Sequence, residues 1–197
     1  MKHTDPNIIP FPVQTPQGAF VLRVDLVLAP VPIWRRLRIG DRASFWDLHV
    51  AIQDAMGWGH RHRHLFVVDH PDTGQRMRLG VPDASPFHGG QAVLPGWEMM
   101  LADIVRRDLP PFLYTYHLGE EWQHEVSLES VETAAMAGPT PACLDGAGAC
   151  PAEGCGGPAR YTQLIADGSL PAGGDFDPAA VVFCDPGLLW KDLFEPE

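Results

Sequence analysis

Three cysteines lie close together in the Gly- and Pro-rich segment CLDGAGACPAEGCGG. Six residues separate Cys143 from Cys150, and four separate Cys150 from Cys155. A structural zinc ion takes about four nitrogen or sulfur donors in a tetrahedron, and short loops with glycine and proline fold thiolates back onto one ion. The cluster therefore indicates a structural zinc site. It leaves two alternatives open, which are a set of small buried thiols and a thiol with redox or catalytic chemistry.

A fourth zinc ligand has to come from elsewhere in the chain. His124 is the leading candidate, and the alternatives are Cys184, His62 and His64. In a reducing cytosol, clustered cysteines are more often metal ligands or core residues than disulfides. On this interpretation the cysteine loop, residues 143–155, is held against the rest of the protein by its sulfur donors and has an architectural role.

Histidines form a second group with metal chemistry. His62 and His64 are two positions apart, which places both imidazoles on one face of a strand, and the alternation in WQHEVSL points His124 inward. Three such imidazoles near Glu125 would suit a hydrolytic metal site with a water in an open position. However, alternation turns Glu125 to the opposite face, and a histidine among apolar neighbours is usually a hydrogen-bonded core residue. A metal-dependent hydrolase or nuclease is accordingly the alternative function.

Charge is distributed unevenly along the chain. The formal net charge is −11, with ten Lys/Arg against seven Asp/Glu in residues 1–80 and four against eighteen in residues 81–197. An acidic surface repels phosphate backbones, which disfavours nucleic-acid binding. A nucleic-acid adaptor remains a further alternative, and its basic patch would consist of Arg35, Arg36, Arg38, Arg61 and Arg63. We expect these arginines to pair with the acidic half instead. A buried Arg35 needs a carboxylate or several carbonyl groups as partners unless a bulge turns it outward, and we expect a structural ion pair rather than a substrate clamp.

Common catalytic motifs are missing from the sequence, which contains no Gly-rich phosphate loop, no GxSxG and no HExxH. The chain is therefore more consistent with a non-enzymatic protein than with an enzyme. No apolar run reaches the roughly 18 residues of a membrane span, and the N-terminal residues lack a signal pattern. We expect a cytoplasmic protein that does not enter a membrane.

Alternation and capping signals predict the elements that position these groups. Apolar residues alternate over 20–28 and 33–39, as in half-buried strands. A helix is expected over 44–56, opened by Ser44 with Asp47 and closed by a glycine. The remaining predicted elements are a strand over 61–69, an excursion outside the core over 70–96, a helical turn over 101–105, a hairpin over 112–128, and short helices over 159–166 and 186–194.

These elements predict the α+β class, with a mainly antiparallel sheet flanked by helices, a Cys/Gly/Pro-rich loop and short C-terminal helices. At 197 residues, the chain fits one domain with a subdomain. Three parts are expected: a flexible N-terminal lead-in over 1–17, a core domain over 18–132, and a C-terminal subdomain over 133–197. The subdomain contains the cysteine loop and is expected to pack on the core.

Several segments resemble the plasmid pRiA4b ORF-three-like family, also catalogued as passenger proteins of an insertion sequence. The matching pieces span Val31 to Ile165 and are VPIWRRLRI, FWDLHVAIQDAMGW, HRHLF, YTYHLGEEWQHEVSLE and CLDGAGACPAEGCGGPARYTQLI. The resemblance implies an antiparallel sheet flanked by helices and an association with plasmids and mobile elements. It implies no catalytic residue, and the hairpin turn departs from the family pattern with His117 and Glu120-Glu121 in place of Asp-rich residues.

Taken together, these observations favour a non-enzymatic interaction or accessory module with a structural zinc ion and a protein partner. Nucleic acid is the less favoured partner because of the acidic charge.

Overall fold

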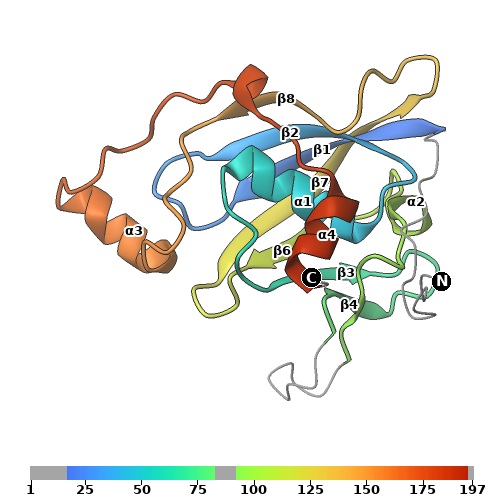
Figure 1. Cartoon of the computed structure of the whole chain (residues 1–197), viewed down its shortest axis with the longest axis horizontal. Helices are drawn as coiled ribbons and strands as arrows, with labels where there is room; N and C mark the ends of the chain where they lie inside the picture. Colours follow the sequence, from blue (N-terminus) through green and yellow to red (C-terminus); the bar gives the residue numbers. More distant parts are fainter. Residues whose placement is uncertain (1–16, 83–91, 195–197) are drawn as a thin grey trace, which may run out of the picture.

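The computed structural model describes residues 17–82 and 92–194, and its strands form one sheet (Figure 1). The strand order is β5-β4-β3-β6-β7-β1-β2-β8, and all neighbouring strands are antiparallel except β4 and β5. The strands are β1 (Gly18–Leu26), β2 (Trp34–Gly40), β3 (His64–Asp69), β4 (Arg76–Gly80), β5 (Leu94–Pro95), β6 (Phe112–Tyr116), β7 (Trp122–Thr133) and β8 (Ala142–Ala147). This arrangement confirms the predicted α+β class.

Four α-helices and one 3-10 helix accompany the sheet in the described residues. They are α1 (Phe45–Met56), α2 (Leu101–Ile104), α3 (Gly157–Ala166), η2 (Pro178–Ala180) and α4 (Pro186–Phe194). Across the two described ranges, none of the helices has the length and apolar character needed to cross a membrane.

Helix α1 has fixed ends and an apolar stripe. Ser44 Oγ accepts a hydrogen bond from the Asp47 N–H at 3.2 Å, and the Asp47 carboxylate accepts one from the Ser44 N–H at 2.6 Å. This is the predicted capping box. Gly57 follows the helix with a φ of 77°, which glycine adopts without a steric penalty. Phe45 and Leu48 are completely buried, so α1 is held in place over one face of the sheet (Figure 1).

The two faces of the sheet differ along β2. The side chains of Arg35, Leu37 and Ile39 are buried on the face that α1 covers, as alternation predicts. The side chains of Trp34 and Arg36 are on the opposite face and are partly exposed. The period of two thus places a guanidinium group inside the core, where it needs hydrogen-bond partners.

One predicted excursion contains a core strand. Residues 70–96 include β4, whose Met77 and Leu79 are buried because β4 pairs with β3 along its whole length. Pairing with a central strand has overridden the weak local pattern here. Residues 83–91 of the excursion and residues 1–16 of the predicted lead-in lie outside the described residues.

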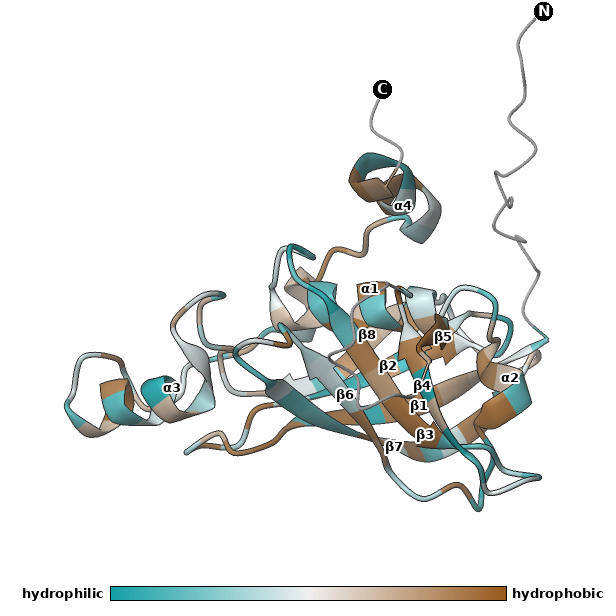
Figure 2. Cartoon of the chain, turned by 90° about the horizontal axis from the view of Figure 1, so that it is seen from below, coloured by the Kyte–Doolittle hydropathy of each residue, from teal (hydrophilic) through white to brown (hydrophobic). Residues whose placement is uncertain are grey.

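The two C-terminal helices lie at different places. Figure 2 shows α4 on the side of α1 that faces away from the strands, and α3 beyond one end of the sheet. The Trp46 indole N–H of α1 donates to the Pro186 carbonyl at 3.0 Å, and its ring meets Trp190 edge-on at a centroid distance of 5.2 Å. These contacts hold the start of α4, and the segment before it, against α1.

Candidate metal centre

The three loop cysteines lie in different surroundings. The Cys143 thiol donates to the Asp145 carbonyl on β8 at 3.5 Å. The Cys150 sulfur contacts the Met56 sulfur at the end of α1 at 3.9 Å, and burial raises the pKa of the Cys150 thiol well above its usual range. Cys155 is partly exposed, and all four cysteines of the chain are free thiols. The three thiols thus have different first neighbours, and among the described residues they are not part of a group of three metal donors within 4.8 Å of one another.

Oxygen acceptors attach the cysteine loop to the core. The Glu153 carboxylate accepts hydrogen bonds from the Tyr116 hydroxyl on β6 and from the Gly59 N–H, the latter at 3.1 Å. The Trp58 indole N–H donates to the Pro151 carbonyl at 2.9 Å. The observed anchors are thus a carboxylate and a carbonyl, where the sequence suggested sulfur donors.

Arg35 is buried, and its hydrogen-bond partners are carbonyl groups. Its Nε donates to the Ala55 carbonyl at 2.7 Å, and its Nη1 donates to the Trp34 and Ala147 carbonyls at 2.8 and 2.9 Å. The Phe176 ring covers the guanidinium carbon at 3.5 Å, a cation–π contact. The expected ion pair is therefore wrong, and the alternative of several carbonyl partners, one of them at the negative end of α1, is what satisfies the guanidinium. Arg35 joins α1, β2 and β8.

Two of the other arginines of the predicted patch form ion pairs with acidic residues. Arg36 pairs with Glu129 at 2.5 Å and with Asp145 at 3.1 Å, and Arg38 pairs with Glu132 at 2.7 Å. For Arg36 and Arg38, these pairs match the expected neutralisation by the acidic half. The last two members of the predicted patch, Arg61 and Arg63, are exposed before β3.

The predicted histidine trio does not converge on one point. His124 is completely buried on β7, with its ring 5.4 Å from Trp58 and 5.2 Å from Tyr114 between centroids. Neither ring nitrogen of His124 has a hydrogen-bond partner among the described residues. Burial lowers the pKa of His124 to about 4 and that of His64 to about 3. His62 precedes β3 and is only partly buried. The two buried imidazoles are therefore neutral core groups.

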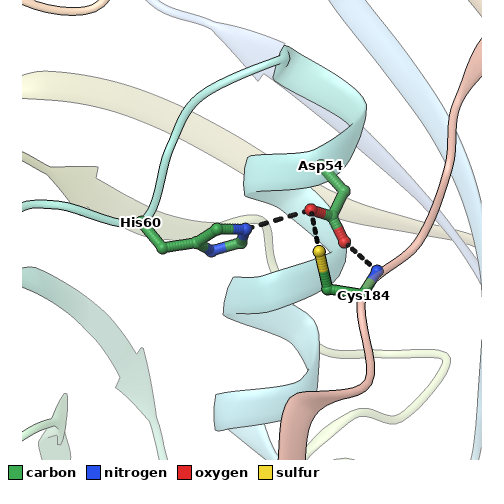
Figure 3. Close-up of side chains that lie close together, drawn as sticks. All are labelled: Asp54, His60 and Cys184. Atoms are coloured by element: carbon green, nitrogen blue, oxygen red, sulfur yellow. Dashed lines mark hydrogen bonds and ion pairs between the residues drawn. The ribbon is translucent and has the colours of Figure 1, made fainter. Parts of the chain in front are cut away.

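A different set of donors does converge. Among the described residues, Asp54, His60 and Cys184 are the group whose ligand atoms all lie within 4.8 Å of one another (Figure 3). Asp54 lies in the last turn of α1, His60 follows that helix, and Cys184 lies just before α4. The His60 Nε2 and the Cys184 Sγ are 3.0 and 3.3 Å from Asp54 Oδ1, and the Cys184 N–H donates to Asp54 Oδ2 at 2.8 Å. Packing of α4 on α1 brings the three together.

The donor types and spacings in this group suit a zinc ion. Zinc binds sulfur at about 2.3 Å and nitrogen or oxygen at about 2.0 Å, so tetrahedral ligand atoms lie about 3.3–3.7 Å apart. The observed 3.0 and 3.3 Å separations are close to these values. The side chains of Asp54 and His60 are only 6% and 7% exposed, so their attraction for a cation is weakly screened by water. A small movement of the donors would complete three ligand positions.

Proton balance and backbone conformation also bear on this group. Burial and, to a lesser extent, the neighbouring Asp54 carboxylate raise the pKa of the Cys184 thiol. A metal ion would have to displace the thiol proton, so the affinity of this group for a metal would rise with pH.

His60 has a φ of 57°, a left-handed conformation that costs a residue other than glycine roughly 1 kcal/mol. Packing therefore holds the imidazole in a position that the local chain disfavours.

Sequence reasoning named Cys184 as an alternative donor and missed Asp54 and His60. The signal was weak, because Asp54 and His60 lie three residues before and three residues after Gly57, where the helix ends. That spacing indicates a metal site only when a third donor from a distant segment lies beside both side chains. The loop cysteines and His124 do not form a group within the same 4.8 Å limit, so their role as zinc ligands stays a prediction.

The chain belongs to the family described as plasmid pRiA4b ORF-3-like protein, whose model matches residues 18–177. The matched range includes Asp54, His60 and the cysteine loop and ends before Cys184. The chain is similar to uncharacterized protein y4hQ of Sinorhizobium fredii, with 27% identity over 190 residues, which cover 89% of this chain and 93% of the relative.

A solved relative supports the fold. The crystal structure of MM3350, a protein of unknown function from Methanosarcina mazei, is similar with a TM-score of 0.74 and 26% sequence identity. The similarity covers 86% of this chain and all of the solved chain. The family resemblance and the fold are thereby confirmed. Neither relative's description names an activity, so function has to be argued from the side chains.

Proposed function

We propose that the protein is a non-enzymatic accessory module that binds one zinc ion through Asp54, His60 and Cys184. The convergence of three zinc-type donors from three separate segments is the observation that carries this proposal. The cofactor is the one suggested by the cysteines, but the ligand set is different and uses Cys184 instead of the cysteine loop.

The ion would act as a clamp for the C-terminal segment. Asp54 and Cys184 are 130 residues apart in sequence, and Asp54 already accepts hydrogen bonds from both the Cys184 thiol and its N–H. Replacement of the thiol and imidazole protons by zinc would tie the segment before α4 to the end of α1 with stronger bonds. A ligand that binds only the folded state stabilises it, by about 2.7 kcal/mol at one hundred times its dissociation constant.

The accessory role rests on charge and on motif content. The net charge of −11 suits a protein partner better than a nucleic acid. No Gly-rich phosphate loop, GxSxG or HExxH motif is present in the sequence. We place the protein in the cytoplasm because four free thiols, one of them a proposed ligand, require a reducing environment.

Metal analysis of the full chain tests the proposal, with two single-cysteine variants as a matched pair. After zinc loading and dialysis, we expect about one zinc per chain in the wild type and in Cys155→Ser, and loss of zinc in Cys184→Ser. Thermal unfolding should show zinc-dependent stabilisation in the same two proteins. Loss of zinc in Cys155→Ser with retention in Cys184→Ser would assign the ion to the cysteine loop and overturn the proposed ligand set.

A second candidate function is a metal-dependent hydrolase, and the number of donors favours it. Structural zinc sites usually have four protein ligands, whereas catalytic sites have three and a water. Asp54, His60 and Cys184 supply three. Turnover of bis(p-nitrophenyl) phosphate by the zinc-loaded protein, abolished in Cys184→Ser and retained in Cys155→Ser, would favour this function and contradict the non-enzymatic role.

A further inference from the structure

A cavity of about 310 Å³ lies beside the candidate metal centre and shares only His60 with it. Its volume is at the lower end of the range of small-molecule sites. The lining residues are Trp46 and His49 of α1, His60 to His64 before and at the start of β3, Val81 after β4, and Leu193 and Phe194 of α4. The cavity is thus bounded by segments from both ends of the chain.

One wall of the cavity consists of two stacked imidazoles. The His49 and His64 rings lie 3.6 Å apart between centroids, with an angle of 10° between their planes. The Trp46 ring lies 5.1 Å from His49 and 5.8 Å from His64. This wall is flat and aromatic, and it carries polar nitrogen atoms at its edge.

Hydrogen bonds occupy one nitrogen of His49. The Gln53 amide donates to the Tyr114 hydroxyl at 3.0 Å, and His49 Nδ1 lies 2.8 Å from the same hydroxyl. His49 Nε2 is therefore the ring nitrogen left for a ligand. Burial lowers the pKa of His49 well below its usual range, and that of His64 to about 3, so both rings are neutral at pH 7.

These neutral rings have hydrogen-bonding capacity to spare. In residues 17–82 and 92–194, the His64 ring and His49 Nε2 make no hydrogen bond to the protein. The His60 Nδ1 is buried and also without a partner. A buried polar atom left unpaired costs roughly 1–3 kcal/mol, and of these ring nitrogens in the described residues only the His60 Nδ1 is buried without a partner. Because His49, His60 and His64 all line the cavity, a ligand there could exchange hydrogen bonds with all three.

The rim of the cavity adds a positive charge. The Arg61 side chain is exposed there, and among residues 17–82 and 92–194 the one hydrogen bond that Arg61 donates comes from its backbone N–H, to the Tyr116 hydroxyl at 3.1 Å. A guanidinium group binds a carboxylate through two parallel hydrogen bonds. Phe194 provides an apolar ring on the α4 side, 6.0 Å from Trp46 between centroids.

We propose that this cavity binds a small heteroaromatic carboxylic acid, with its ring between the aromatic walls, a ring nitrogen on the imidazoles, and its carboxylate on Arg61. This inference goes beyond the zinc site and does not depend on it. His49 Nδ1 is already taken by the Tyr114 hydroxyl and His60 Nε2 by Asp54, so His49 offers Nε2, His60 offers Nδ1 and His64 offers its ring nitrogens, which suits a ring nitrogen rather than a second anionic group.

Calorimetric titration of the full chain with nicotinate tests the proposal, in parallel on chelator-treated and zinc-loaded protein. Benzoate lacks the ring nitrogen and nicotinamide lacks the charge, so the three compounds separate the two recognition elements. We expect saturable nicotinate binding in both metal states and about tenfold weaker binding of each comparison compound, the equivalent of about 1.4 kcal/mol.

Two variants locate the binding. Arg61→Gln changes an exposed side chain and leaves the core intact, and His64→Phe keeps an aromatic ring but removes both nitrogens. Each should weaken nicotinate binding by about tenfold. No saturable binding by the wild type, equal binding of all three compounds, or equal binding by the wild type and Arg61→Gln would overturn the proposal. Because chelator-treated protein is included, failure here is distinguishable from failure of the zinc site.

Discussion

Two regions of this molecule carry thiols, and they use them differently. In the cysteine loop, three thiols that are close in sequence do not form a three-donor group within 4.8 Å among the described residues, and Glu153 attaches the loop to the core. At the other end of the chain, the single thiol of Cys184 faces Asp54, which also contacts His60. Clustering along the sequence is therefore a poorer guide to a ligand set here than convergence in space.

The difference has an electrostatic origin. Burial raises the pKa of the Cys150 thiol, and no carboxylate or imidazole contacts it in the described residues, so this thiol is a small apolar core group. Burial also raises the pKa of Cys184, but there a carboxylate and an imidazole are within ligand distance. A cation would be stabilised only in the second environment.

The largest expected effect is a loss of folding stability at low pH, which comes from buried histidines and not from the thiols of the cysteine loop. His64 and His124 have a pKa near 6.5 when unfolded and about 3 and about 4 when folded, so the unfolded state binds more protons below pH 6.5. Stability should be complete well above pH 6.5 and fall as the pH drops towards 4, by about 4 kcal/mol at pH 5 for these two together. His49, whose pKa burial also lowers well below its usual range, adds to this loss. The loop thiols are already protonated and add nothing to this change.

Urea unfolding between pH 5 and pH 7.5 measures that loss. In His124→Phe, the difference between the two pH values should be smaller by about 2 kcal/mol, because one of the three buried histidines that take up a proton on unfolding has been removed. An unchanged pH dependence in this variant would mean that His124 is charged in the folded state.

The next largest effect concerns the anchor beneath the cysteine loop. Arg35→Met leaves the Ala55 and Ala147 carbonyls without their donor and removes the contact with Phe176. We expect a loss of about 3 kcal/mol in the free energy of unfolding. Arg36→Met on the exposed face is the control and should cause a much smaller change. Equal effects of the two substitutions would show that the buried arginine is not structural.

A smaller effect is expected at the acceptor that holds the loop itself. Glu153→Ala removes the partner of the Tyr116 hydroxyl and of the Gly59 N–H. We expect a loss of about 1–2 kcal/mol in urea unfolding and faster proteolysis within the loop. Glu125→Ala, which changes an exposed position on β7, serves as the matched control. Similar proteolysis of both variants would argue that the sulfur atoms hold the loop instead.

The smallest expected effect is a change in thiol reactivity, with no change in fold. Cys184 is exposed, whereas Cys150 is only partly exposed and has a thiol pKa well above its usual range, so iodoacetamide should modify Cys184 first in the metal-free protein. Zinc at one hundred times its dissociation constant should slow the modification of Cys184 by about a hundredfold. Mass spectrometry of labelled peptides measures both rates. Zinc protection confined to the cysteine loop would reverse the comparison between the two regions.

Much of the fold was predictable because its signals are local. The capping box of Ser44 and Asp47 needs only neighbouring residues, and the helix forms where these residues predict it. The alternation that buries Arg35 and His124 follows from the period of two of a strand. The partners of those side chains were not predictable, because the Ala147 carbonyl that binds Arg35 is 112 residues away.

The sequence by itself determined the family, the α+β class, the main elements and which polar side chains enter the core, since each depends on residues that are near in the chain. The tertiary structure alone decided which donors meet. Asp54 and Cys184 are brought together by the packing of α4 on α1, through contacts such as Trp46 with Trp190. Many pairs of donor residues look equally plausible from the local sequence. Long-range packing decides which of these pairs meet, because packing depends on the burial of whole surfaces and not on the spacing of single residues.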